Sequence, residues 1–177
     1  EVKPAVGPEV TLSTCQLDFL LPRRFDLSYI DNKGEKKTPV VLHRAIFGTF
    51  DRFTAFLIEE TKGAFPTWLA PVQVNIIPVN NNYHLTYANE IYKMLKDASV
   101  RVELDDRDEK LSYKMRESQT KKIPITLILG DKERDESLVS YRRHGSNKTY
   151  SVQKDAFKDL LLNEIRSKKS NKNQENN

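Results

Sequence analysis

The sequence has a single cysteine, Cys15, among its 177 residues. One cysteine excludes an intrachain disulfide and a zinc cage built from cysteines of this chain, and it fits a reducing compartment. The sequence also lacks an apolar run near the ~20 residues that a membrane-spanning helix needs. Its first residues, EVKPAVGPEV, show no signal-peptide pattern. We therefore expect a cytoplasmic protein without membrane contact.

Glycine (6 residues) and histidine (3 residues) are also scarce. His43, His84 and His144 stand far apart, and no second histidine or cysteine lies at metal-ligand spacing. The segment PVNNNYHL contains no glycine, which disfavours a flavodoxin-like small-molecule binder, because such a protein needs a glycine-rich or hydroxyl-rich loop after its first strand. The net charge of +4 permits a polyanionic partner such as nucleic acid but does not demand one.

The first part of the chain, residues 1–70, has the pattern of a strand, a short strand, a turn, a second strand and a helix. The turn is expected at 32–34, the second strand at 38–46, and Thr49 is an acceptable N-cap for the helix that follows. The first strand is expected over LSTCQLDFLL, residues 12–21. Because these few strands and one helix cannot bury their own apolar residues, we interpret this part as the end of a larger sheet.

The second part, residues 71–167, alternates strands and helices and ends in a hairpin and a helix. This order predicts an α/β fold: a three-layer α/β/α unit whose five-stranded mixed sheet has a parallel portion and an antiparallel edge. The tail, 168–177, has no apolar residue and is expected to be disordered. The expected strands and helices lie at residues 72–79, 84–98, 100–104, 109–121, 125–129, 138–143, 149–152 and 153–167.

Two residues interrupt the apolar segment VVLHRAIFGTFDRF. His43 can ligate a metal or relay a proton, although the pattern alone favours a histidine bonded locally in a strand. Arg52 lies one turn into the expected helix, where backbone N–H groups and a guanidinium fork suit a phosphate. The pattern alone favours instead a solvent-facing arginine paired with Asp51 or Glu59.

Further polar residues stand on one face of an element. Thr14, Gln16 and Asp18 alternate on the first strand, as a solvated face or a pocket lining would. A stripe of basic residues lies on the helix at 109–121, and the strand ends that follow add further charged residues. Such a stripe is usually a solvated helix, but lysines on phosphates and Glu or Arg on base edges are also how single-stranded RNA is bound. The residues of this second group are Lys110, Lys114, Arg116, Lys121, Lys122, Glu133, Arg142 and Arg143.

Four segments resemble, in order, the C-terminal part of the bacterial threonyl-tRNA synthetase family. They are LSTCQLDFLLPRRFDLSY, VVLHRAIFGTFDRFTAFLIEE, FPTWLAPVQV and DDRDEKLSYKMRE…KKIP…LILGDKE. The resemblance implies that residues 1–70 are the end of an antiparallel class II catalytic domain with its third signature motif. It also implies that residues 71–167 are an anticodon-binding domain. The implied activity is a threonine–tRNA ligase, an ATP-dependent aminoacyl-tRNA ligase of protein biosynthesis.

The resemblance also implies roles for individual residues. Arg52 matches the motif arginine that holds the ATP phosphates, with Thr49 near the nucleotide and Mg²⁺ accompanying ATP. Gln16 and Thr14 match positions that line the threonyl-adenylate pocket. The implied catalytic residues are Arg52 and Gln16. His43 matches a zinc ligand, where the metal grips the amino group and hydroxyl of threonine. The positions that match those facing the anticodon loop of threonine tRNA are Asp108, Lys110, Arg116, Glu133 and Arg142.

The sequence departs from the family pattern at two positions. Asp108 stands where the family commonly has asparagine, and a carboxylate cannot donate a hydrogen bond to a base; Ser112 stands where glycine is common. Since the match begins inside the catalytic sheet, we expect the other zinc ligands and signature motifs to be missing and the chain to be inactive alone. The intact enzyme is expected to be a homodimer. The alternative is a non-catalytic RNA-binding or regulatory module built on the same anticodon-binding fold.

Overall fold

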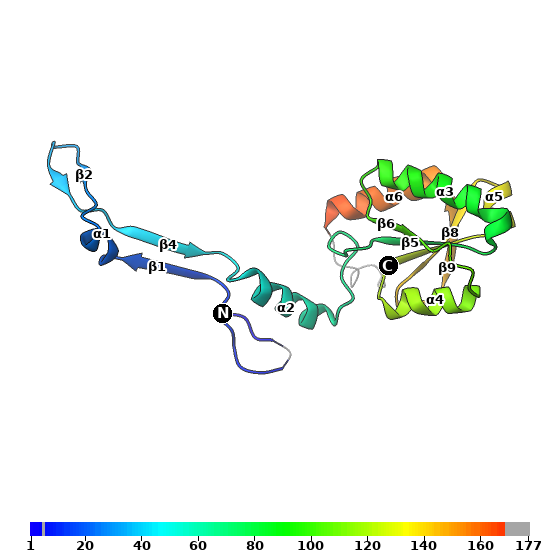
Figure 1. Cartoon of the computed structure of the whole chain (residues 1–177), viewed down its shortest axis with the longest axis horizontal. Helices are drawn as coiled ribbons and strands as arrows, with labels where there is room; N and C mark the ends of the chain where they lie inside the picture. Colours follow the sequence, from blue (N-terminus) through cyan, green and yellow to red (C-terminus); the bar gives the residue numbers. More distant parts are fainter. Residues whose placement is uncertain (5, 169–177) are drawn as a thin grey trace. The chain divides into compact units, whose positions relative to one another are not determined.

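The computed structural model describes residues 1–4 and 6–168 and divides the chain into two compact units, Glu1–Lys62 and Gly63–Asn177 (Figure 1). Of the tail predicted to be disordered, all but Lys168 lies outside the described residues. In the described part of the chain, no helix has the length and apolar character needed to cross a membrane.

The first unit consists of two short antiparallel ribbons and a helix. Strand β1 pairs with β4, and β2 pairs with β3. Asp18 ends β1 because its carboxylate accepts the N–H groups of Leu20 and Leu21, which turns the chain into α1 before the predicted end of the strand. The elements are β1 (Thr14–Asp18), α1 (Leu21–Arg24), β2 (Tyr29–Ile30), β3 (Lys36–Lys37), β4 (Val41–Ala45) and α2 (Phe50–Thr61).

The boundaries of helix α2 follow from its capping residues. The Thr49 hydroxyl accepts the N–H of Arg52, as predicted, and satisfies one of the free donors of the first turn. At the other end, Lys62 and Gly63 both have positive φ, 52° and 74°, which ends the helix. The predicted N-cap at Thr49 is therefore confirmed.

The second unit contains the predicted five-stranded mixed sheet. Its strand order is β6-β5-β7-β8-β9, in which β6, β5 and β7 are parallel and β8 and β9 are antiparallel. The elements are β5 (Val74–Pro78), α3 (Asn81–Asp97), β6 (Val102–Leu104), α4 (Leu111–Thr120), β7 (Ile125–Leu129), α5 (Asp131–Asp135), β8 (Leu138–Arg143), β9 (Thr149–Gln153) and α6 (Lys154–Ser167).

The two faces of this sheet differ. Helices α3 and α6 cover one face and enclose the core, whereas α4 lies on the other face (Figure 1). Because strand side chains alternate between faces, Leu127 and Val139 enter the core while Thr126 and Ser140 point to the α4 side. The α4 side of β7 to β9 is therefore the polar side of the sheet.

The segment between α2 and β5 belongs to the second unit. The Thr67 hydroxyl donates to Glu164 at 2.6 Å, and Arg143 grips the same carboxylate with two bonds of 3.1 and 2.7 Å. Arg101 donates to the carbonyls of Trp68 and Ala70, each at 2.9 Å. These bonds explain why the structure divides the chain after Lys62, whereas the sequence predicts the change near residue 70.

Candidate functional sites

The β1–β4 ribbon brings the predicted pocket residues onto one face. Gln16 lies directly opposite His43, and Thr14 lies opposite Ala45. Asp18 follows Gln16 by two positions on the same face, and its Oδ2 lies 2.9 Å from His43 Nε2. The hydrogen bond from the Leu21 N–H, followed by that from His43, holds the pKa of Asp18 below its usual range.

His43 is positioned to supply a single ligand to a metal ion. A metal-bound histidine usually donates its other ring N–H to a carboxylate, which is what Asp18 accepts here. Nδ1 would then be the coordinating atom. Among residues 1–4 and 6–168, however, no group of three or more His, Cys, Asp or Glu side chains is placed to hold a metal.

Arg52 lies in the first turn of α2, as predicted. Its guanidinium Nη1 donates to the Thr11 carbonyl at 3.4 Å. The alternative of an ion pair with Asp51 or Glu59 is not found among the described residues, and Glu59 instead accepts the N–H of Val6. The charged end of Arg52 is therefore held near a helix N-terminus without a neutralising carboxylate, an arrangement that suits an anion.

A polar patch covers the α4 side of the sheet in the second unit. Arg142 of β8 lies between Thr126 of β7 and Thr149 of β9, and it donates to the Thr149 hydroxyl at 3.1 Å. Thr126 in turn meets Ser118 of α4, with 2.7 Å between their hydroxyl oxygens. Arg142 Nε is buried with no hydrogen-bond partner in the described structure. The guanidinium is thus fixed at one end with a donor unsatisfied.

Glu133 lies beside the same patch, at the start of α5. Its Oε2 accepts the Gly130 N–H at 2.9 Å, and its Oε1 accepts the Ser140 hydroxyl at 2.5 Å. Although burial opposes ionisation, these two donors hold the pKa of Glu133 below its usual range. Ser140 precedes Arg142 by two residues on β8, so an oriented carboxylate and a guanidinium share one face of the sheet.

The remaining predicted anticodon residues lie before and on α4. Asp108, Lys110 and Arg116 are exposed, and in the described chain none of their side chains forms a hydrogen bond or ion pair. The segment that contains Asp108 follows β6, while Glu133 follows β7. Since β6 and β7 run parallel, both lie at the carboxyl edge of the sheet, where open α/β sheets bind ligands.

The predicted basic stripe is wrong in part. Lys114 is only 2% exposed, because it lies on the side of α4 that faces the sheet. Lys121 is 3.5 Å from Glu117, one helical turn away. Arg143 points to the opposite face from Arg142, since neighbouring strand residues alternate, and there it pairs with Glu164.

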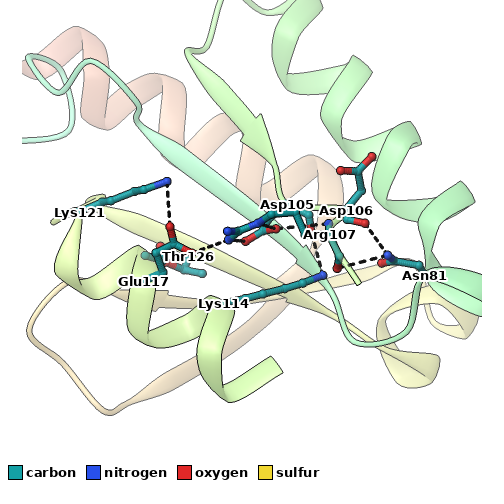
Figure 2. A network of polar contacts seen from close by, with 9 residues as sticks. Asn81, Asp105, Asp106, Arg107, Lys114, Glu117, Lys121 and Thr126 are labelled. Carbon is teal, nitrogen blue, oxygen red and sulfur yellow. Dashed lines mark hydrogen bonds and ion pairs between the residues drawn. The ribbon is translucent and has the colours of Figure 1, made fainter. Parts of the chain in front are cut away.

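Sequence reasoning missed the polar network that holds the segment after β6 (Figure 2). Arg107 bridges Asp105 and Glu117, and Asn81 donates to the carbonyl of Asp106. The only sequence pattern that pointed to this network was the dense run of opposite charges, DDRDEK, which by itself indicates a solvated loop.

Comparison with known protein families matches these two units to two separate descriptions. A family model described as "Anticodon binding domain" matches residues 73–164, more than half of the chain. The chain belongs to the anticodon-binding domain family. A second model, "tRNA synthetase class II core domain (G, H, P, S and T)", matches residues 2–61, ahead of the anticodon-binding domain.

Relatives of the whole chain confirm the resemblance to threonyl-tRNA synthetases. The chain is 57% identical over 173 residues to the threonine–tRNA ligase of Staphylococcus carnosus and 56% identical over 169 residues to that of Oceanobacillus iheyensis. These matches cover 98% and 96% of the chain but only 27% and 26% of the relatives, so the chain spans about a quarter of their length.

A solved structure supports the fold of the anticodon-binding domain and the ribbon before it. The crystal structure of the RNA binding domain of threonyl-tRNA synthetase from Cryptosporidium parvum Iowa II superposes with a TM-score of 0.78 at 28% identity. The match covers 90% of this chain and 40% of that one.

Proposed function

We propose that the anticodon-binding domain of this chain recognises the anticodon loop of a threonine tRNA, and that the chain works as part of a threonine–tRNA ligase. The observation that supports this most is the polar α4 side of the sheet, where hydrogen bonds orient the side chains of Glu133 and Arg142. Single-stranded loops are recognised by such groups on their base edges, with cations on their phosphates.

Each side chain has a role that its chemistry allows. Arg142 carries a planar guanidinium that Thr149 orients, and such a fork suits a base acceptor such as the O6 or N7 of guanine. Glu133 uses two of its lone-pair sites on Ser140 and Gly130 and keeps others for a base amino group. Lys110 and Arg116 suit phosphates, while Asp108 can only accept a hydrogen bond.

The first unit would contribute to the activation of threonine in the same enzyme. Arg52, with Thr49 beside it, would hold the phosphates of ATP, whose charge Mg²⁺ partly neutralises. Gln16 and Thr14 would line the pocket for threonyl-adenylate. His43, oriented by Asp18, would supply one ligand to zinc, which would act as the Lewis acid that binds the threonine amino and hydroxyl groups. We place this activity in the cytoplasm, in a homodimer.

A binding experiment with the whole chain tests the proposal. Labelled threonine tRNA and the same tRNA with a substituted anticodon are titrated with the chain at several salt concentrations. We expect at least about tenfold tighter binding to the native anticodon, with affinity falling as salt rises because phosphate contacts release counterions. Equal affinity for the two RNAs would refute anticodon recognition.

A matched pair of variants locates the site. Arg142→Lys retains the charge but loses the planar fork, so we expect discrimination between the two RNAs to fall about tenfold or more. Arg166→Lys, on the exposed side of α6, is the control and should leave discrimination unchanged. If both variants behave alike, the α4 side of the sheet is not the RNA site.

A further inference from the structure

The segment that follows β6 is held in place although it forms neither helix nor strand. The Lys114 ammonium donates to the Asp105 carbonyl at 3.0 Å. The Asn81 amide donates to the next carbonyl, that of Asp106, at 2.5 Å, and lies 3.4 Å from the carbonyl of Arg107. Three consecutive carbonyls are therefore anchored by side chains from two different helices, α3 and α4 (Figure 2).

A charged clamp ties the side chains of this segment to α4. Arg107 makes a two-bond fork to the Asp105 carboxylate, at 2.8 and 2.7 Å, and its Nη2 also donates to Glu117 at 2.5 Å. The hydrogen bonds from Arg107 hold the pKa of both carboxyl groups below their usual range. Both acids are therefore ionised at neutral pH, and the clamp is a fixed network of charges.

The clamp makes Arg107 itself a poor ligand for RNA phosphate. Two carboxylates surround its guanidinium, so the local charge is negative rather than positive. Lys114 is equally unavailable, because it is 2% exposed and its ammonium is directed at the Asp105 carbonyl. A buried ammonium group is costly unless it is hydrogen-bonded, and the Asp105 carbonyl provides that bond for Lys114. Arg107 and Lys114 therefore fix the backbone and do not offer a charge for RNA binding.

The residues next to the anchored carbonyls are the free ones. Asp108 and Lys110 follow directly and expose their side chains, with no partner in the described chain. A loop that is ordered before binding avoids the entropic cost of being ordered by its ligand. The anchored segment therefore separates into a part that is bound by the protein and a part left for a ligand.

We propose that Arg107 and Lys114 are positioning residues for RNA binding, which hold the segment 105–110 so that Asp108 and Lys110 face the anticodon loop. This inference rests on the proposed function and specifies how one side of its site is built. It assigns no direct RNA contact to Arg107 or Lys114.

Binding of a synthetic threonine anticodon stem–loop by the full chain tests the proposal through a double-mutant cycle. Arg107→Ala should weaken binding about tenfold, because the loop must then be ordered by the RNA. Lys110→Ala should weaken binding about fivefold in the parent chain but less than about twofold in the Arg107→Ala background. In that background Lys110 is already misplaced, so its removal costs little further affinity. Fully additive effects would overturn the positioning role.

Three further variants separate position from charge. Arg107→Lys retains the positive charge without the fork, so it should bind as weakly as Arg107→Ala; recovery of parent affinity would instead show that charge is what matters. Arg166→Ala removes one arginine from α6, on the other side of the sheet, and should bind like the parent. Lys114→Met keeps the apolar stem and should reproduce the loss seen with Arg107→Ala.

Backbone order measured without RNA gives an independent result. The ¹⁵N order parameters of residues 105–110 should be near 0.85 in the parent and fall below about 0.6 in Arg107→Ala. Unchanged order parameters would overturn the positioning role even if the chain recognises the anticodon. Failure of the parent chain to distinguish anticodons, with the order parameters as expected, would instead refute the proposed function.

Discussion

The two units of this chain differ in how they treat apolar side chains. In the described structure, the buried apolar residues of the first unit are Leu12 and Pro22, and the other buried hydrophobic residues lie in the second unit. The first unit exposes many large apolar side chains, among them Leu42 (58%), Phe47 (59%) and Phe50 (84%). Secondary structure alone therefore does not make a stable unit, because two-stranded ribbons without a covered face gain little from burial.

The largest expected effect comes from separating the two units. A chain of residues 63–177 should be folded and unfold cooperatively, because it retains the whole core and the bonds of Thr67 and Arg101. A chain of residues 1–62 should show neither a cooperative transition nor dispersed amide signals. Circular dichroism during heating and NMR spectra provide the measurement. Cooperative unfolding of the 1–62 chain would contradict the claim that the first unit is not stable by itself.

A pair of leucine substitutions examines the same difference within the whole chain. Leu161→Ala removes a fully buried side chain from the core and should lower the free energy of unfolding by about 3 kcal/mol. Leu42→Ala changes a side chain that is 58% exposed and should stay within about 0.5 kcal/mol. Urea denaturation measures both, and equal losses would show that the first unit has a core after all.

The buried ion pair of the second unit should have the next largest effect. Glu164→Ala leaves both Arg143 and Thr67 without their acceptor in a buried site, so we expect a loss of about 2 kcal/mol in the free energy of unfolding. Lys154→Ala removes an exposed ion pair with Glu90 in the same unit and is the matched control, with no measurable change expected. Similar losses in both variants would show that the buried bonds of Glu164 stabilise the fold no more than an exposed ion pair does.

The sequence predicted most of the second unit because its patterns are long and local. Strand β7 and strand β8 have the expected bounds, and the apolar face of α3 is buried at Tyr87, Ile91 and Leu95. Helix α5 was missed, because DKERD has no apolar residue and the helix depends on Gly130 and the carboxylate of Glu133. A five-residue helix of charged side chains leaves no periodic signal.

Side-chain direction is what the sequence could not provide at the candidate sites. The spacing placed Lys114 with Lys110 in one stripe, yet burial of Lys114 depends on where α4 meets the sheet. The partnership of Gln16 and His43 depends on the register of β1 with β4, which connects positions far apart in the chain. The resemblance to synthetases brought these residues to attention, while only the fold shows what each one contacts.

The smallest expected effect is the contribution of one carboxyl group, that of Glu133, to the pH dependence of stability. The pKa of Glu133 is held below its ordinary value of 4.5 in the folded chain, so in acid the unfolded chain binds more protons than the folded one. The stabilisation is thus complete above about pH 4.5 and is lost as the pH falls through the lower, folded pKa. Ser140→Ala removes one donor, so the pKa of Glu133 should rise toward 4.5.

An NMR titration of the Glu133 carboxyl carbon measures this shift directly in both chains. Since the Gly130 N–H still donates to Oε2 in the Ser140→Ala variant, the midpoint should rise by less than it would if both donors were lost. Asp31 of the first unit, whose pKa the hydrogen bond from Lys37 holds below its usual range, should titrate identically in both proteins. An unchanged midpoint for Glu133 would mean that Ser140 does not orient this carboxylate, and the oriented acceptor assigned to RNA recognition would lose its support.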